Sequence, residues 1–135
     1  MKEISTVLTG LIVGVLSYLI VSLSLKPIIR YRKTKHDILS DLIFFANVIN
    51  PERLNENMKK KCERRVESNR RHSSELVACY SDLPFWFKRW LECKNEKPLD
   101  ASTHLLGLSN TVDFNTADKR VQKIKKHLRF ETKVI

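Results

Sequence analysis

Polar and apolar positions divide the chain into one continuous apolar stretch and a longer, highly charged remainder. Residues 4–25 contain no charged side chain, and only Ser, Thr, Gly and Tyr relieve their apolar character. A helix of that length extends about 33 Å, enough to cross a hydrocarbon core of about 30 Å. We therefore expect residues 1–25 to form a transmembrane anchor and residues 26–135 to form one small domain with a single core.

Helical periodicity continues after the apolar stretch. Pro27 biases Lys26 away from helical geometry and predicts a bend at the membrane surface. A helical stripe follows over residues 28–49, with a basic first half and an apolar second half. Asn50 and Pro51 are then typical of the start of another helix.

That next helix, expected over residues 52–81, is long and charged. Its eight bases and five acids leave a thin apolar stripe that is interrupted near Asn69 and Ser73, and we expect its charged face to be solvated. A short helix is predicted over residues 101–108 and a basic amphipathic helix from Asn115. The chain is thus predicted to be all-α, with one N-terminal transmembrane helix followed by a small domain of four to five helices.

A strong positive charge adds an orientation to this layout. The net charge of +10 belongs to the part after the apolar stretch, because Lys2 is offset by Glu3 before it. Five bases follow the stretch within ten residues and form a predicted membrane-surface basic cluster: Lys26, Arg30, Arg32, Lys33 and Lys35. The positive-inside rule then predicts an external N-terminus and a cytoplasmic C-terminal domain. The layout resembles that of many small single-span proteins of the bacterial inner membrane, which is the localisation we expect.

Small residues recur on one face of the predicted span. Thr6, Gly10 and Gly14 are four residues apart and include a G-x-x-x-G pattern, which lets two helix backbones approach closely. This transmembrane association face predicts a homo-oligomer or pairing with another membrane helix. The alternative is an anchor that has no helix partner.

Four aromatic residues gather just after the long helix, interleaved with two bases: Phe85, Trp86, Phe87 and Trp90. Three interpretations of this aromatic cluster are open. Core packing is favoured, because large rings bury well and helices this polar need a dense apolar centre. Anchoring at the lipid headgroups comes second, since Trp beside Lys and Arg suits that zone. Base stacking comes third.

The last predicted helix carries a basic face opposite its apolar stripe. Its members are Lys119, Arg120, Lys123, Lys126 and Arg129. The sequence leaves open whether lipid, a protein or only solvent meets this face. Nucleic acid is disfavoured, because no aromatic residue between Asn115 and Arg129 alternates with these bases for stacking.

Motifs for catalysis or cofactor binding are absent from the sequence. Gly107 is the only glycine after the apolar stretch, so a phosphate-binding glycine loop cannot form, and neither H-E-x-x-H nor G-x-S-x-G occurs. The four His and the three Cys (Cys62, Cys79 and Cys93) lack the spacing of a metal site or a disulfide framework, so we expect reduced thiols. No enzymatic activity, cofactor, metal or small-molecule substrate is expected.

These patterns favour a single-pass membrane-anchored interaction protein. Its basic helical cytoplasmic domain is predicted to dock a protein partner near the anionic leaflet. One alternative is a small membrane effector or toxin that self-associates through its transmembrane helix and impairs the membrane on activation. The other is a membrane-tethered nucleic-acid binder.

Overall fold

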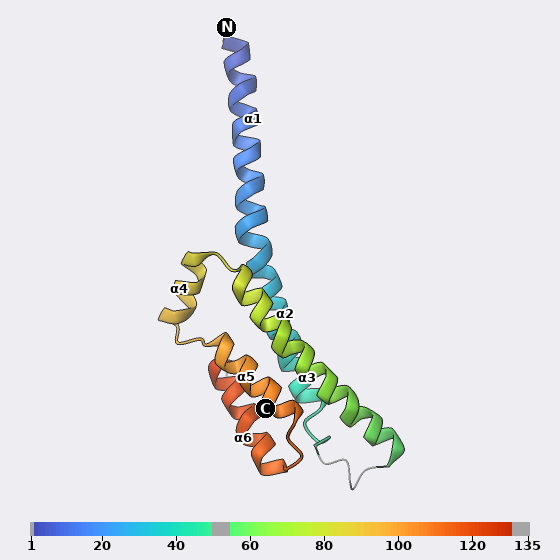
Figure 1. Ribbon diagram of the computed structural model, residues 1–135. Helices are drawn as coiled ribbons and strands as arrows, with labels where there is room; N and C mark the ends of the chain where they lie inside the picture. Colours follow the sequence, from blue (N-terminus) through green and yellow to red (C-terminus); the bar gives the residue numbers. More distant parts are fainter. Residues whose placement is uncertain (1, 50–54, 131–135) are drawn as a thin grey trace.

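The computed structural model describes residues 2–49 and 55–130, and every regular element in that part of the chain is a helix. The elements are α1 (Lys2–Ile20), the π-helical stretch η1 (Val21–Leu25), α2 (Lys26–Phe44), α3 (Glu56–Asp82), α4 (Phe85–Cys93), α5 (Pro98–Ser109) and α6 (Phe114–His127). Figure 1 shows α1 projecting from a domain built by the other helices. The prediction of an all-α chain, with four to five helices after the apolar one, is confirmed for the described residues.

The chain passes from α1 into α2 without leaving helical geometry. Lys26 has φ −59° and ψ −48°, so the expected non-helical conformation before Pro27 is wrong. The π-helical turn of η1 lies immediately before this proline, and such turns let a helix axis change direction without unwinding. The predicted bend therefore takes this form, and Figure 1 shows the ribbon changing direction while it stays helical.

Side-chain caps set the starts of α3 and α6. Asn55 caps α3, because its Oδ1 accepts a hydrogen bond from the Met58 backbone N–H at 3.0 Å. The predicted cap at Asn50 and the helix start at Pro51 lie outside the described residues. Asp113 caps α6 in the same way and accepts from the Thr116 N–H at 2.8 Å, two residues before the expected start at Asn115.

The core of the domain lies where α3 packs against α2 and α5, and α5 packs against α6. Ile38, Leu76, Leu105 and Ile124 supply fully buried side chains from these four helices. The apolar side chains of α1 take no part in this core, since every described side chain from Ile4 to Val21 is exposed. α1 and η1 thus form the candidate span, part of a helix long and apolar enough to cross a membrane.

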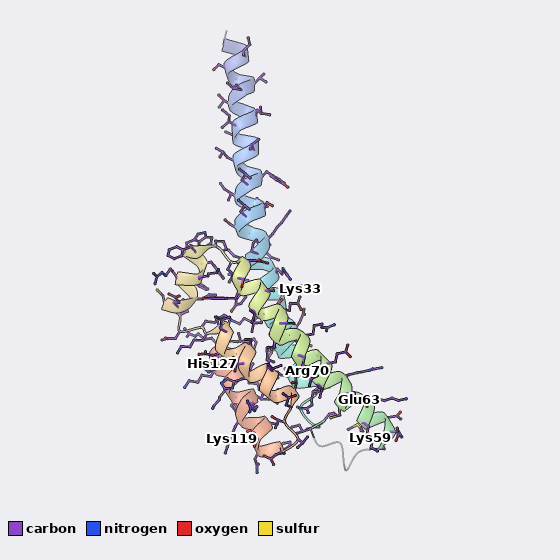
Figure 2. The ribbon with its side chains drawn as sticks, in the orientation of Figure 1. Lys33, Lys59, Glu63, Arg70, Lys119 and His127 are labelled. Atoms are coloured by element: carbon purple, nitrogen blue, oxygen red, sulfur yellow. The ribbon has the colours of Figure 1, made fainter. Side chains whose placement is uncertain are left out.

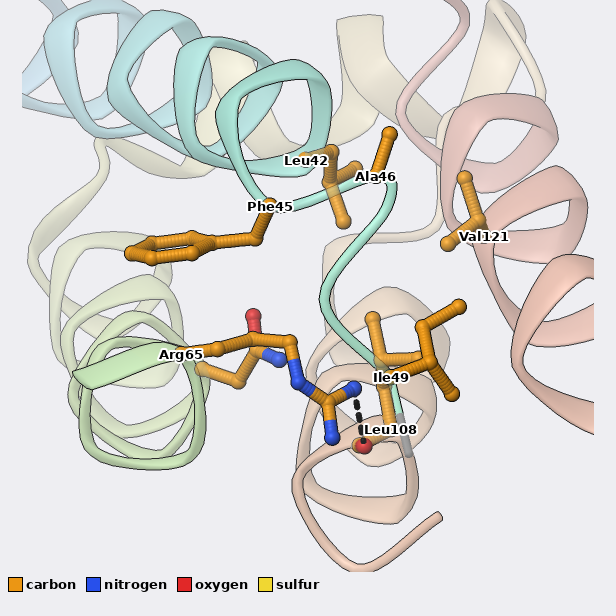
Figure 3. A pocket seen from close by; sticks show the side chains of 8 residues that line it. Leu42, Phe45, Ala46, Ile49, Arg65, Leu108 and Val121 are labelled. Atoms are coloured by element: carbon orange, nitrogen blue, oxygen red, sulfur yellow. Dashed lines mark hydrogen bonds between the residues drawn. The ribbon is translucent and has the colours of Figure 1, made fainter. Parts of the chain in front are cut away.

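Polar residues fill the middle of the inner face of α3. Arg65, Asn69 and His72 are all buried there, although the sequence suggests a solvated charged helix. The Arg65 guanidinium donates to the backbone carbonyls of Leu108 at 3.4 Å and Thr111 at 3.1 Å, and so fastens α3 to the end of α5. Figure 3 shows it beside a cavity of about 30 Å³ whose other walls are mostly apolar.

Candidate membrane-proximal site

The end of the helical domain nearest the candidate span is built by the first turns of α2, the end of α3 and α4. Arg30 on α2 donates to the Asp82 carboxylate at the end of α3 over 3.1 Å. One residue further on, the Tyr31 ring meets the Phe87 ring of α4 edge-on, with 6.3 Å between centroids. Figure 1 accordingly shows α4 beside the start of α2, at the base of the candidate span.

The predicted membrane-surface basic cluster is divided between surface and interior. Lys26, Arg32 and Lys33 are exposed. Lys35 lies half a turn around the helix from Lys26, and its ammonium group turns into the domain and donates to Glu96 Oε1 at 2.8 Å. Grouping the five bases by sequence proximity therefore overlooked the rotation of the helix.

Glu96 forms a buried polar junction between α2 and the turn that follows α4. Its Oε1 accepts from the Tyr31 hydroxyl at 2.6 Å as well as from Lys35. Glu96 is 7% exposed, so its negative charge depends on these two donors for compensation. The junction holds the C-terminal end of α4 against α2, while the contact of Tyr31 with Phe87 holds the middle of α4.

α4 buries one edge and exposes the rings on the other. Phe87 and Leu91, one helical turn apart, are its buried residues. Phe85 is 72% exposed, Trp86 56% and Trp90 45%, although Trp90 stacks on Phe87 with 5.2 Å between centroids. The core-packing interpretation of the aromatic cluster therefore holds for Phe87 and is wrong for the other three rings.

The basic face of α6 is smaller than the sequence suggests. Arg120 is half-buried, and its guanidinium covers Gly107 so closely that a Cβ there would lie 2.0 Å from Nη1. Arg129 is exposed, but its Nη1 donates to the Lys94 backbone carbonyl. The residues that remain as an exposed stripe, here called the lysine stripe, are Lys119, Lys123 and Lys126.

A second polar group between α2 and α3 escaped the sequence reasoning. Asp41 Oδ2 accepts from the Ser68 hydroxyl and lies 2.9 Å from His72 Nε2. Both partners bind the same carboxylate oxygen, so Ser68 has no histidine positioned to accept its proton, as a nucleophilic triad requires. The group joins two helices. Ser68 and His72 lie on the buried side of α3, and the sequence did not reveal this side because polar residues occupy its middle.

Two histidines stack where α5 meets α6. The rings of His104 and His127 are 5.4 Å apart between centroids and nearly parallel. Burial, together with the neighbouring Lys123, lowers the pKa of His104. The protonated imidazolium is therefore disfavoured between helices that carry several cations.

The predicted transmembrane association face is uncovered by the rest of the chain at its two glycines. A Cβ built on Gly10 or Gly14 would have no neighbouring atom within 4 Å. Thr6 lies on the same side of α1, as its spacing requires. Whether a second helix meets this face stays a prediction.

The fold and its surfaces define a class: an all-α protein with one N-terminal helix apolar enough to cross a membrane and a basic helical domain attached to it. Comparison of the chain with protein-family models, with curated proteins and with solved structures found no match. The surfaces of this chain are therefore the basis for a functional proposal.

Proposed function

We propose that this chain is a single-span membrane protein whose helical domain lies in the cytoplasm and docks an acidic protein partner through the lysine stripe of α6. The observation that carries this proposal is the composition of α6. Its buried side holds Ala117 and Ile124, whereas its outward side presents three lysines one turn apart. Asp118 is the only acid within α6, so the stripe has little intrahelical compensation.

The height of the first half of α6, which carries Lys119, favours a protein over the lipid surface as the partner of the lysine stripe. Phe114 and Val121 of α6 line one hollow with Leu42 and Ala46 near the end of α2. Leu42 lies 17 positions after the end of the candidate span. That separation is about 25 Å along a helix, roughly three Debye lengths at physiological ionic strength. Figure 2 shows Lys119 at the end of the domain away from the candidate span.

The proposed orientation rests on the charges next to the candidate span. Lys26, Arg32 and Lys33 remain exposed on the first turns of α2, while Arg30 is half-exposed beside Asp82. Basic residues that directly follow a span are retained on the cytoplasmic side. An inner-membrane location with the domain in the cytoplasm therefore accounts for both the apolar helix and these cations.

A membrane-tethered nucleic-acid binder is the less favoured proposal. Single-stranded nucleic acid needs rings that alternate with cations, and the exposed rings lie on α4 whereas the lysine stripe lies on α6. Phe114, at the start of α6, is the one exposed ring on that helix. A binder of this kind requires an affinity for DNA or RNA that falls steeply with salt.

Capture from native membranes tests the protein-docking proposal. The tagged full chain, solubilised in mild detergent, should recover a partner in stoichiometric amount. Changing Lys119, Lys123 and Lys126 to Glu should abolish the recovery, because the complementary charges then repel. The matched control makes the same charge change on the exposed face of α3, at Lys60, Arg64 and Arg71, and should retain the partner.

Four results would contradict this proposal. Recovery of no stoichiometric partner, or equal loss with both triple variants, removes the role of the lysine stripe. Recovery of DNA or RNA instead of protein supports the nucleic-acid alternative. Reaction of the exposed Cys93 with an impermeant maleimide added outside intact cells removes the cytoplasmic orientation.

The uncovered glycine face supports a second proposal, a membrane effector that assembles through its spans. Gly10 and Gly14 leave space for a second backbone, as self-associating helices require. Induced expression should then impair growth and membrane potential, and Gly10→Ile with Gly14→Ile should relieve both effects. Unaffected cells under every inducing condition argue against this role.

A further inference from the structure

The aromatic side of α4 is the most unusual surface of the domain. The helix has nine residues, and the exposed fraction of its Phe85, Trp86 and Trp90 side chains averages more than half. Large exposed rings on a soluble face are costly and normally mark a contact with another phase or molecule. The position of α4 in the domain indicates whether these rings meet a lipid phase or another molecule.

Two contacts fix the height of α4 relative to the candidate span. Arg30 meets Asp82, and Tyr31 meets Phe87, so the first turn of α4 lies level with the second turn of α2. Arg30 is five positions after the last residue of the candidate span, Leu25. This distance is about 8 Å of helix, and the polar layer on each side of a bilayer is about 5–8 Å thick.

The direction of α4 brings its rings to that layer. Figure 1 shows α4 running away from the candidate span, so its first turn is the end nearest to it. Phe85 and Trp86 are the first two residues of the helix and are more exposed than Trp90. The two most exposed rings thus lie at the end that reaches furthest toward the membrane surface.

The side chains around these rings suit a lipid headgroup layer. The Arg89 guanidinium lies 5.3 Å from the Phe85 ring centroid and also pairs with Glu92 at 3.2 Å. Lys88 donates to the Ser81 carbonyl at 2.8 Å beside them. Trp with neighbouring cations is enriched at the membrane interface, where the ring is buried and the polar groups meet headgroups and water.

We infer that α4 is a second membrane contact, an interfacial helix whose Phe85 and Trp86 rings enter the headgroup layer of the bilayer that holds the span. This inference rests on the proposed membrane anchoring of the chain. Its consequence is a defined tilt, because a domain held at the span and at α4 cannot lean away from the bilayer surface. The lysine stripe then faces the cytosol at a fixed height.

Tryptophan fluorescence tests the inference directly, because the chain has two Trp residues and both lie in α4. The full chain is reconstituted in vesicles of phosphatidylcholine and phosphatidylglycerol that contain a lipid brominated near the headgroup end of its acyl chain. Trp90→Phe leaves Trp86 as the only reporter. Trp86 should lose most of its emission to the brominated lipid and little to aqueous iodide.

A distal ring provides the matched control. Phe114 is 60% exposed, close to the exposure of Trp86, but lies at the start of α6. In a chain with Trp86→Phe, Trp90→Phe and Phe114→Trp, emission should be lost to iodide and retained with the brominated lipid. The two reporters then differ in position along the domain and little in intrinsic exposure.

Flotation of the vesicles separates the two ways in which the inference fails. A chain that floats with the vesicles, but whose Trp86 is quenched by iodide and not by brominated lipid, overturns the α4 contact and leaves the anchor intact. A chain that does not float with the vesicles overturns both proposals. Floating together with quenching of Trp86 by brominated lipid, and of the Phe114→Trp reporter by iodide, supports the inference.

Discussion

α4 and α6 are packed by the same rule and expose opposite chemistry. Each is a peripheral helix fixed by a few buried apolar residues, Phe87 and Leu91 in α4 and Ala117 and Ile124 in α6. Outward, α4 presents aromatic rings and α6 presents the lysine stripe. Packing therefore does not explain the difference, which we attribute to the surroundings proposed for each face: a lipid interface near the candidate span and an aqueous phase further away.

The largest expected effect comes from removing the buried anchor of either helix. Ile124→Ala and Leu91→Ala should each lower the free energy of unfolding by about 2–5 kcal/mol, because both leave a cavity in a close-packed core. Both residues are at most 1% exposed. Denaturant unfolding of the full chain in detergent measures the change, and the half-exposed Leu106→Ala should stay within about 0.5 kcal/mol.

Unequal losses of stability in Leu91→Ala and Ile124→Ala would distinguish the packing of α4 from that of α6. If Leu91→Ala leaves global unfolding unchanged while Ile124→Ala does not, α4 is a unit that opens separately from the core. Equal costs make both surfaces parts of one cooperative domain.

The next effect isolates the placement of α4. Glu96→Gln removes the charge that pairs with Lys35. We expect the free energy of unfolding to fall by about 1–3 kcal/mol, because both groups lie mostly inside the domain. The exposed Cys93 should also react faster with a maleimide, because the end of α4 is less firmly held. The exposed pair of Glu92 with Arg89 is the control, and Glu92→Gln should change stability by less than about 1 kcal/mol.

A smaller effect concerns pH at the interface of α5 and α6. Because the pKa of His104 is lowered in the folded protein, the unfolded chain binds more protons below its ordinary pKa of about 6.5. Stability should therefore be full above that pH and should fall as the pH drops toward the lowered value. His104→Gln should flatten this slope in thermal unfolding between neutral and mildly acidic pH. An unchanged slope would place the sensitivity in another group.

The smallest effect on the domain is expected from the candidate span. Gly10→Ile with Gly14→Ile should leave unfolding of the domain unchanged, because no atom beyond the adjacent residues and backbone of α1 itself lies within 4 Å of either added Cβ. Association of the spans, measured by crosslinking in membranes, should fall if the glycine face is used. The same oligomer distribution in both proteins would remove the predicted association face.

Periodicity predicted the helices well because each of them buries a repeating stripe. It placed the end of α3 before Pro84 and the end of α5 near Ser109, because residues typical of turns end the helix at both places. It was less accurate at the starts of α3, α5 and α6. Several residues near each of those starts can serve as caps, and tertiary packing selects among them.

The interior of α3 was the part that sequence reasoning missed. The buried positions Cys62, Arg65, Asn69, His72, Leu76 and Cys79 follow a regular alternation of three and four residues. A search for apolar residues loses this stripe at its centre, where polar groups replace them. The partners of Arg65 are backbone carbonyls more than forty residues away, and no local pattern reveals them.

The sequence indicated which residues the candidate surfaces contain, but not which side of each helix those residues face. The bases assigned to α2 and α6 lie on those helices except Arg129, which follows the end of α6 with a φ of 50°, and Lys35 and Arg120 turn inward toward Glu96 and Gly107. The rings of α4 were expected in the core, and only one of them is buried. Which side of a helix faces a neighbour is decided by tertiary contacts that composition does not contain.

The continuous helix from Lys2 to Phe44 leaves no flexible linker between the candidate span and the domain. A protein on a flexible tether samples a wide hemisphere beneath its attachment point, whereas a chain anchored as proposed here moves as a rod and keeps its domain within a thin layer parallel to the bilayer. For such an anchored chain, encounters with other proteins of the same membrane would be nearly two-dimensional, so a modest intrinsic affinity would yield high occupancy.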